Sequence, residues 1–187
     1  MAIKPSGIPY NRLTSDSIVI VGIASGHILI SEFSRAPSVD TPIHLEIYRR
    51  FPEVGGIAHT HSPYATAFAQ AGQPIPCCGT THADAFFGEV PVTRILTEQE
   101  VEGDYERNIG VLIASMLKPD AIPAILMNGH GPFTVGKTAQ EAVDNALILE
   151  KVAMLALVGL QPLYLPSYLQ KKHFLRKHGQ AASYGQL

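Results

Sequence analysis

Two histidines, His59 and His61, are separated by a single threonine in the segment GGIAHTHS, residues 55–62. Because alternate side chains of a β-strand point to the same face, this spacing predicts that both imidazoles can bind one metal ion. Catalytic zinc sites commonly use three protein ligands and keep another position open for water or substrate. The candidate third ligand is His130, because the glycines on both sides of it tolerate a sharp turn and a close approach of the backbone.

The reactive side chains also have plainer interpretations. Histidines at this spacing can be ordinary solvated or core residues, so the pattern indicates a metal site without excluding that alternative. The two cysteines, Cys77 and Cys78, are adjacent in the chain, a spacing that would strain a disulfide between them and does not match zinc-ribbon motifs. We therefore predict that both are reduced thiols with a packing role.

The proposed ligands are predicted to lie at the ends of regular elements. One strand is expected to carry both His59 and His61. It leads into a helix that Ser62 caps and Gly72 ends. His130 is expected in a turn between strands at residues 124–127 and 133–135. Strand ends are where mixed α/β folds commonly place their sites.

The rest of the chain is predicted from apolar periodicity and from turn and cap residues. The capping box that Thr138 and Glu141 form opens the longest expected helix. The other predicted elements are a β-hairpin of strands 18–21 and 27–30, a helix 41–50, a polar loop within 75–95 that includes 79–84, a helix 105–117, the continuation of the capped helix to about 158, and a short basic helix 167–179.

The composition bounds the class of protein. The 187 residues are 46% hydrophobic and 16% charged, with a formal net charge of −2 that gives no electrostatic footprint for nucleic acid or anionic membranes. The length fits one domain with a substantial core. The longest apolar run, 152–160, is too short to span a bilayer, and no signal-peptide core precedes it at the N-terminus. We therefore expect a cytoplasmic protein.

Taken together, the motifs resemble the class II aldolase and epimerase family, and most closely its L-ribulose-5-phosphate 4-epimerase branch. The resemblance runs through nearly the whole chain, with the motifs in the order that the family shows. The segments that carry it are IKPSG (3–7), PSVDT (37–41), GGIAHTHS (55–62), GTTHAD (79–84), GHGPF (129–133), RKHG (176–179) and YGQ (184–186).

The resemblance implies one α/β domain over residues 1–187, with a central, largely antiparallel sheet flanked by helices. It also implies a C4 homotetramer with active sites between neighbouring subunits. The implied cofactor is Zn2+, bound by His59, His61 and His130, with Asp40 also facing the metal. The related aldolases have a glutamate at the position of Asp40, whose alternative role is to cap the helix that follows it.

The implied activity is epimerisation of L-ribulose 5-phosphate to D-xylulose 5-phosphate at C4, by retro-aldol cleavage and re-addition. The C4 proton lies beta to the C2 carbonyl and is not acidic, so simple deprotonation is not a route. Asp84 and Tyr184 match the family's two proton-transfer residues, with Tyr184 reaching in from a neighbouring subunit. The alternative for Asp84 is a loop aspartate that bonds its own backbone, and the alternative for Tyr184 is a residue of a loose tail. The implied phosphate and substrate contacts are Lys4, Ser6, Gly7, Ser38 and Val39.

The sequence departs from the family pattern at two places. Val39 replaces a usual serine, and the relatives' first helix and Gly-Asn phosphate motif have no counterpart before residue 3, so we expect an N-terminally truncated domain. His82 and His173 are further candidates near the site, whereas His27, His44 and His178 are expected at the surface or in packing. Two other functions stay open, a class II aldolase and a non-catalytic assembly module, as does the pentose pathway, arabinose breakdown being one option.

Overall fold

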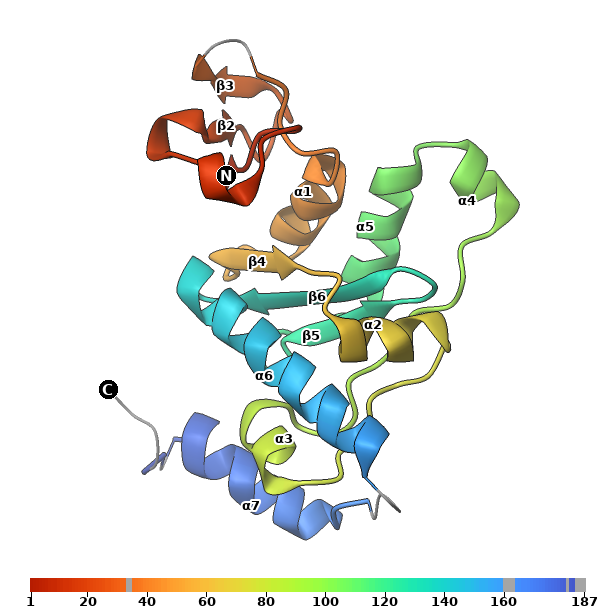
Figure 1. Cartoon of the computed structure of the whole chain (residues 1–187). Coiled ribbons are helices and arrows are strands. Elements are labelled where there is room, and N and C mark those ends of the chain that lie inside the picture. Colours follow the sequence, from red (N-terminus) through yellow and green to blue (C-terminus); the bar gives the residue numbers. More distant parts are fainter. Residues whose placement is uncertain (33–34, 160–163, 181, 184–187) are drawn as a thin grey trace. The chain divides into compact units, whose positions relative to one another are not determined.

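The computed structural model describes residues 1–32, 35–159, 164–180 and 182–183 (Figure 1). Its contacts divide the chain into two compact units. Unit 1 comprises Met1–Pro52 and Leu96–Ser115, and unit 2 comprises Glu53–Ile95 and Met116–Leu187. None of the described helices is long and apolar enough to cross a membrane.

Unit 1 contains a three-stranded antiparallel sheet in the order β1-β2-β3. The predicted hairpin is confirmed, since β2 and β3 pair on either side of a turn in which Gly26 has a φ of 71°. The elements of this unit are β1 (Ala2–Ile3), η1 (Tyr10–Arg12), η2 (Ser15–Ser17), β2 (Val19–Val21), β3 (Ile28–Ile30), α1 (Thr41–Arg50), α4 (Glu98–Glu102) and α5 (Tyr105–Met116, in unit 1 up to Ser115).

Helix α1 confirms the predicted helix at 41–50. Asp40 occupies the N-cap position, and its side chain makes no cap hydrogen bond. The helix begins here because Pro42 fixes a helical φ in the first turn. Helix α5 approaches α1 closely at Gly110, where a Cβ would lie 2.9 Å from the Cα of Ile43.

Helix α4 was not predicted, although its signal is present in the sequence. Thr97 accepts a hydrogen bond from the N–H of Glu100 at 3.3 Å, and the Glu100 carboxylate accepts one from the N–H of Thr97 at 2.8 Å. This reciprocal pair is a capping box, and it stabilises the start of a five-residue helix.

Unit 2 contains the second sheet, antiparallel in the order β4-β6-β5. The central strand β6 is buried along its whole length. His59, the last residue of β4, lies opposite Phe133 of β6 in the register. The elements of this unit are β4 (Gly56–His59), α2 (Pro63–Gln70), α3 (Thr80–Ala85), β5 (Ala124–Met127), β6 (Gly131–Gly136), α6 (Ala139–Val158) and α7 (Ser167–His178).

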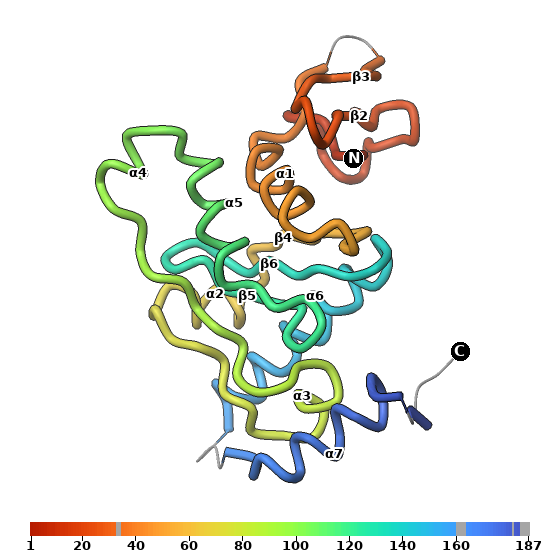
Figure 2. The backbone as a smooth tube through the Cα atoms, turned by 180° about the vertical axis from the view of Figure 1, so that it is seen from behind, coloured from red at the N-terminus to blue at the C-terminus, as the bar shows by residue number. Residues whose placement is uncertain are grey.

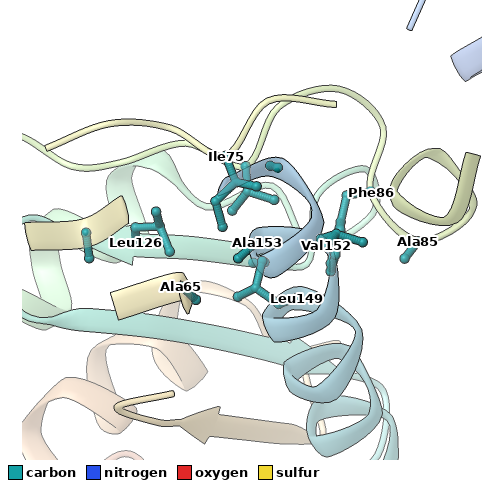
Figure 3. Packing of buried hydrophobic residues seen from close by; sticks show 12 residues of the cluster. Ala65, Ile75, Ala85, Phe86, Leu126, Leu149, Val152 and Ala153 are labelled. Atoms are coloured by element: carbon teal, nitrogen blue, oxygen red, sulfur yellow. The ribbon is translucent and has the colours of Figure 1, made fainter. Parts of the chain in front are cut away.

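Helix α6 packs along this sheet and against α2 (Figure 1). Its buried side chains recur at helical spacing and meet the buried residues of α2, β5 and the segment around Ile75 (Figure 3). Thr138 caps the helix by accepting from the N–H of Glu141 at 3.1 Å. The Glu141 carboxylate accepts from the N–H of Lys137 instead of closing a capping box on Thr138, so only half of the predicted box is present.

The prediction that the polar segment 79–84 is a loop is wrong, because this segment forms most of helix α3. Its local sequence lacks a strong cap, because Gly79 at the N-cap has no side chain that could accept from a helix N–H. The helix forms because it can bury Ala83, Ala85 and the ring of His82. Helix α7 packs on it, as the opposite view also shows (Figure 2). Packing therefore overrides weak local propensity here.

The predicted fold class is confirmed as mixed α/β, with antiparallel strands and flanking helices. The strands form a three-stranded sheet in each unit in place of the single central sheet that we expected. The predicted helices at 41–50, 105–117, 138–158 and 167–179 are confirmed to within two residues at each end. That residues 1–187 form one domain stays a prediction.

Candidate metal centre

The three predicted histidine ligands converge in unit 2. The Nε2 atom of His61 lies 3.2 Å from that of His59 and 3.1 Å from that of His130. The ring centroids of the three pairs are 4.9 to 5.0 Å apart, and the ring planes meet at 70° to 72°. The imidazoles are therefore arranged with nearly threefold symmetry around one point.

This geometry fits a tetrahedral metal ion. Nitrogens bound about 2.05 Å from a tetrahedral zinc ion lie about 3.3 Å from one another, close to the separations found here. Among the described residues, these three form the group that could hold a metal ion, with ligand atoms within 4.8 Å of one another. His61 is exposed and the other two are partly buried.

The neighbours of His59 fix its tautomer and its orientation. Its Nδ1 lies 2.9 Å from the carbonyl oxygen of Pro132, which can only accept, so Nδ1 carries the proton and the lone pair lies on Nε2. The ring also stacks on Phe133, with centroids 4.0 Å apart and planes at 10°. Outer contacts of this kind orient metal-binding imidazoles.

His61 reaches the cluster differently from the prediction. Strand β4 ends at His59, so His61 does not share a strand face with it. The backbone stays attached to β6 for one more residue, through the Thr60 N–H and the Pro132 carbonyl at 3.3 Å, and then turns into α2. The predicted strand-to-helix junction is confirmed, with Ser62 at the N-cap, and this turn brings the imidazole back toward His59.

His130 lies in the turn between β5 and β6, as predicted. Gly129 has a φ of 72°, which an L residue rarely adopts, and its N–H donates to the carbonyl of Ala69 in α2. A Cβ on Gly131 would lie 2.8 Å from the carbonyl oxygen of Thr60. Both flanking glycines are therefore required, one for the turn and the other for the close approach of β6.

Asp84 lies on α3 and is held by side chains of α7. It accepts hydrogen bonds from Arg176 at 2.8 and 3.1 Å and from His173 at 3.0 Å, and its own carbonyl lies 2.9 Å from a ring nitrogen of His178. Burial by itself would raise the pKa of Asp84, but the bonds from Arg176 and His173 outweigh it and hold the pKa below its usual value. The alternative of a loop aspartate bonded to its own backbone is wrong.

Two other titratable groups of unit 2 are buried. Burial lowers the pKa of His82 to about 4, against a smaller opposite effect of the Gly88 carbonyl that accepts from its Nε2. Its Nδ1 has no partner among the described residues, so the ring is neutral. Burial raises the pKa of the Cys77 thiol to about 11, and both cysteines are free, as predicted. None of these groups is activated as a nucleophile.

The predicted phosphate contacts lie together in unit 1. The N–H of Ser6 donates to the carbonyl of Ala36, and that of Ser38 to the carbonyl of Lys4, both at 2.9 Å. These two N–H groups are thus already used, and an anion there would meet hydroxyl groups and the Lys4 ammonium. Gly7 has a φ of 74°, and Val39 is exposed.

The Ser38 hydroxyl also lies against Asp40, 3.4 Å from a carboxylate oxygen and 3.3 Å from the N–H. The cap alternative for Asp40 holds for its position only, because Asp40 is the N-cap residue of α1 but its carboxylate makes no cap hydrogen bond. Its role as a metal ligand stays a prediction. Tyr184 lies outside the described residues.

Sequence reasoning missed the residues that support the ligands. Pro132 and Phe133 follow the GHG turn directly, and an aromatic residue next to a ligand strand is a signal that could have found the stacking partner of His59. Glu150, whose carboxylate bonds the start of α2, carried no local signal, since its partners lie 85 and 86 residues away.

Comparisons with known proteins identify a family and a fold that this chain resembles. Residues 1–157 match the model of a family described as the class II aldolase and adducin N-terminal domain. A solved L-fuculose 1-phosphate aldolase is 26% identical, with a TM-score of 0.71 over 92% of this chain and 77% of that one. YgbL from Klebsiella pneumoniae is 24% identical, with a TM-score of 0.70 over 90% and 79%. L-fuculose 1-phosphate aldolase from Glaciozyma antarctica PI12 is 23% identical, with a TM-score of 0.73 over 96% and 68%. The last two likenesses are of fold alone.

Proposed function

This chain belongs to the class II aldolase and adducin N-terminal domain family, and from that premise we propose that it is a metal-dependent enzyme of sugar-phosphate metabolism. The reaction would break and re-form a carbon–carbon bond by aldol chemistry. The observation that carries this proposal is the convergence of three Nε2 atoms, from His59, His61 and His130, at metal-binding distances.

The chemistry of the donor set supports Zn2+ as the cofactor. Three neutral imidazoles would fill three coordination positions of a zinc ion without neutralising its positive charge. An anionic or carbonyl oxygen is therefore favoured at the open position. When bound there, the ion would act as a Lewis acid on a carbonyl oxygen of the substrate. The proton on Nδ1 of His59 keeps the ligand lone pair directed at the ion.

The specific reaction we propose is conversion of L-ribulose 5-phosphate to D-xylulose 5-phosphate. The C3–C4 bond opens, the aldehyde fragment turns, and re-addition inverts C4. Asp84 and Tyr184 are proposed to move the proton of the C4 oxygen on the two faces of the aldehyde, with Tyr184 supplied by a neighbour in a homotetramer. Asp84 is ionised at neutral pH, as a proton acceptor must be, although its bonds from Arg176 and His173 lower its pKa and so make it a weaker base.

The remaining site roles are proposals from the same resemblance. Asp40 would be the additional group that faces the metal, and its aspartate identity favours the epimerase outcome. The phosphate and the rest of the substrate are assigned to Lys4, Ser6, Gly7, Ser38 and Val39. The local pairing of residues 4–6 with 36–38 supports this group as one anion-binding surface.

A second candidate is net aldol cleavage, which the 26% identity to an L-fuculose 1-phosphate aldolase favours. The two outcomes differ in what accumulates. An aldolase releases its aldehyde, whereas an epimerase retains it until re-addition. The non-catalytic alternative is weaker, because the three ligand histidines are present and converge.

The test is to incubate zinc-loaded protein with L-ribulose 5-phosphate and to measure D-xylulose 5-phosphate beside the free fragments of C3–C4 cleavage, dihydroxyacetone and glycolaldehyde phosphate. We expect the epimer without accumulation of fragments. Accumulation of fragments, or cleavage of L-fuculose 1-phosphate in a parallel assay, would establish the aldolase instead. Turnover that persists unchanged in His130→Ala would contradict any metal-dependent function.

A further inference from the structure

The start of helix α2 is held by a carboxylate from another helix. The N–H groups of Tyr64 and Ala65 each donate to one oxygen of Glu150 on α6, both at 2.9 Å. Helices α2 and α6 pack side by side, as both backbone views show (Figures 1 and 2). Glu150 thus accepts from two consecutive backbone donors that begin directly after the ligand segment.

Glu150 takes the place of the expected cap. Ser62 occupies the N-cap, but its hydroxyl makes no cap bond and instead accepts from the Thr60 hydroxyl at 3.2 Å. Pro63, the first residue of the helix, has no N–H, and the N–H of Thr66 bonds the Ser62 carbonyl. Tyr64 and Ala65 are therefore the donors of the first turn that need an outside acceptor, and Glu150 supplies both oxygens.

The negative charge of Glu150 also suits this position. The N-terminus of a helix carries a partial positive charge, so an ionised carboxylate there is stabilising. A bond between a charged acceptor and a backbone N–H is stronger and shorter than a neutral one. Glu150 and both bonds are partly buried, which protects them from competition with water.

The position of His61 depends on this contact. On its N-terminal side, the backbone is fixed to β6 by the Thr60 N–H and the Pro132 carbonyl. On its C-terminal side, two residues separate His61 from Tyr64, the first residue that Glu150 holds. Unlike His59, it has left the strand and gains no support from sheet pairing. The start of α2 is therefore the second of its two anchors.

We propose that Glu150 is a positioning residue for the metal centre, which holds the start of α2 so that the imidazole of His61 stays within binding distance of the other two. This inference rests on the proposed metal function of the three histidines. Metal ligands must keep their distances to within about 0.2 Å, so a loosened helix start would reduce affinity without removing any ligand.

The experiment compares wild type with Glu150→Ala, Glu150→Gln and Glu141→Ala. Glu141 is the matched control, because it lies on the same helix and its carboxylate also accepts from a backbone N–H, that of Lys137, far along the helix from Glu150. Each protein is titrated with Zn2+ against a chromophoric chelator. Each is also loaded with Co2+ to record its visible ligand-field spectrum, and hydrogen exchange is followed at the amides of Tyr64 and Ala65.

We expect Glu150→Ala to bind Zn2+ about 10-fold more weakly, the lower end of the range for outer-shell changes, with an altered Co2+ spectrum and faster exchange at both amides. Glu150→Gln retains one acceptor oxygen and should recover part of the affinity. Glu141→Ala should lower thermal stability while leaving Zn2+ affinity and the Co2+ spectrum as in wild type.

Two results would overturn the positioning role alone. In one, Glu150→Ala exchanges faster at both amides but keeps the wild-type Zn2+ affinity and Co2+ spectrum. In the other, the amides of the variant stay as protected as in wild type. A wild-type protein that binds no Zn2+ would overturn the metal centre itself and this role with it, an outcome distinct from the first two.

Discussion

The Nδ1 of His59 lies 2.9 Å from the carbonyl oxygen of Pro132. Pro132 directly precedes Phe133, the residue that pairs with His59 in the β4-β6 register. The same carbonyl accepts the N–H of Thr60 at 3.3 Å. Strand pairing therefore decides which ring nitrogen of His59 carries the proton, and it directs the other nitrogen toward the remaining two histidines. The sheet sets the chemistry of this ligand as well as its place.

Removal of a ligand should abolish tight metal binding. We expect His61→Ala and His130→Ala to weaken Zn2+ binding by more than the 10- to 100-fold typical of outer-shell changes, because each removes one of three coordinating nitrogens. Calorimetric titration with Zn2+ checks this. His27→Ala, in unit 1 and outside the cluster, is the control and should bind like wild type. Equal affinity in all variants would show that the histidines do not form the site.

Loss of the ring that stacks on His59 should affect metal affinity more than stability. Phe133→Leu removes the stacking partner while keeping an apolar side chain, so we expect a stability loss of about 1 kcal/mol and a roughly 10-fold weaker Zn2+ affinity. Phe86→Leu is the matched control, since Phe86 is as deeply buried but lies outside the triad. Denaturant unfolding and Zn2+ titration of both variants check this, and equal affinity losses would contradict a specific role for stacking.

The contact between Asp84 and helix α7 should stabilise the protein above acidic pH. The folded pKa of Asp84 is lowered, so its ionised form contributes stability above the unfolded pKa of about 4, and this contribution is lost as the pH falls through the folded pKa. We expect Asp84→Asn to cost about 2 kcal/mol at neutral pH.

Denaturant unfolding of wild type and Asp84→Asn over a range of pH measures this contribution. The difference between the two proteins should shrink toward zero in strong acid. A difference that is constant with pH would mean that the charge of Asp84 plays no part. Arg176→Gln, which removes the cationic partner but leaves the carboxylate, should reproduce most of the loss.

Burial of His82 should make the protein less stable on mild acidification. Its folded pKa of about 4 is below the unfolded value of about 6.5, so between these values the unfolded chain binds a proton that the folded chain does not. The contribution of His82 to the free energy of unfolding is fully present above about pH 6.5 and falls by about 2 kcal/mol when the pH is lowered to about 5.

The variant His82→Leu removes the titrating group and should flatten this part of the curve. It also loses the bond to the Gly88 carbonyl, so it is expected to be less stable than wild type at neutral pH. The gap between the two proteins should narrow as the pH is lowered. Stability curves that run parallel would contradict a neutral buried imidazole.

Much of the fold followed from signals that act within a few residues. Helices α1 and α2 begin where expected, each with a proline in its first turn, and the apolar spacing of α6 gives both its length and its buried face. Residue type and the flanking glycines also predicted that His59, His61 and His130 come together, and the structure confirms that they converge. These features are local because caps, turns and periodicity depend on near neighbours.

Tertiary structure alone decided how the ligands meet and what supports them. His61 joins the cluster through the turn after β4, and the carboxylate of Asp84 is held by α7. Segment α3 is a helix because the helical conformation buries side chains against the rest of unit 2. His61 and His130 are 69 residues apart, and Glu150 lies 86 residues from Tyr64. Such partners are fixed only when the sheet pairs and α6 packs on it, since no short-range preference specifies which distant group will satisfy a buried donor or complete a ligand set.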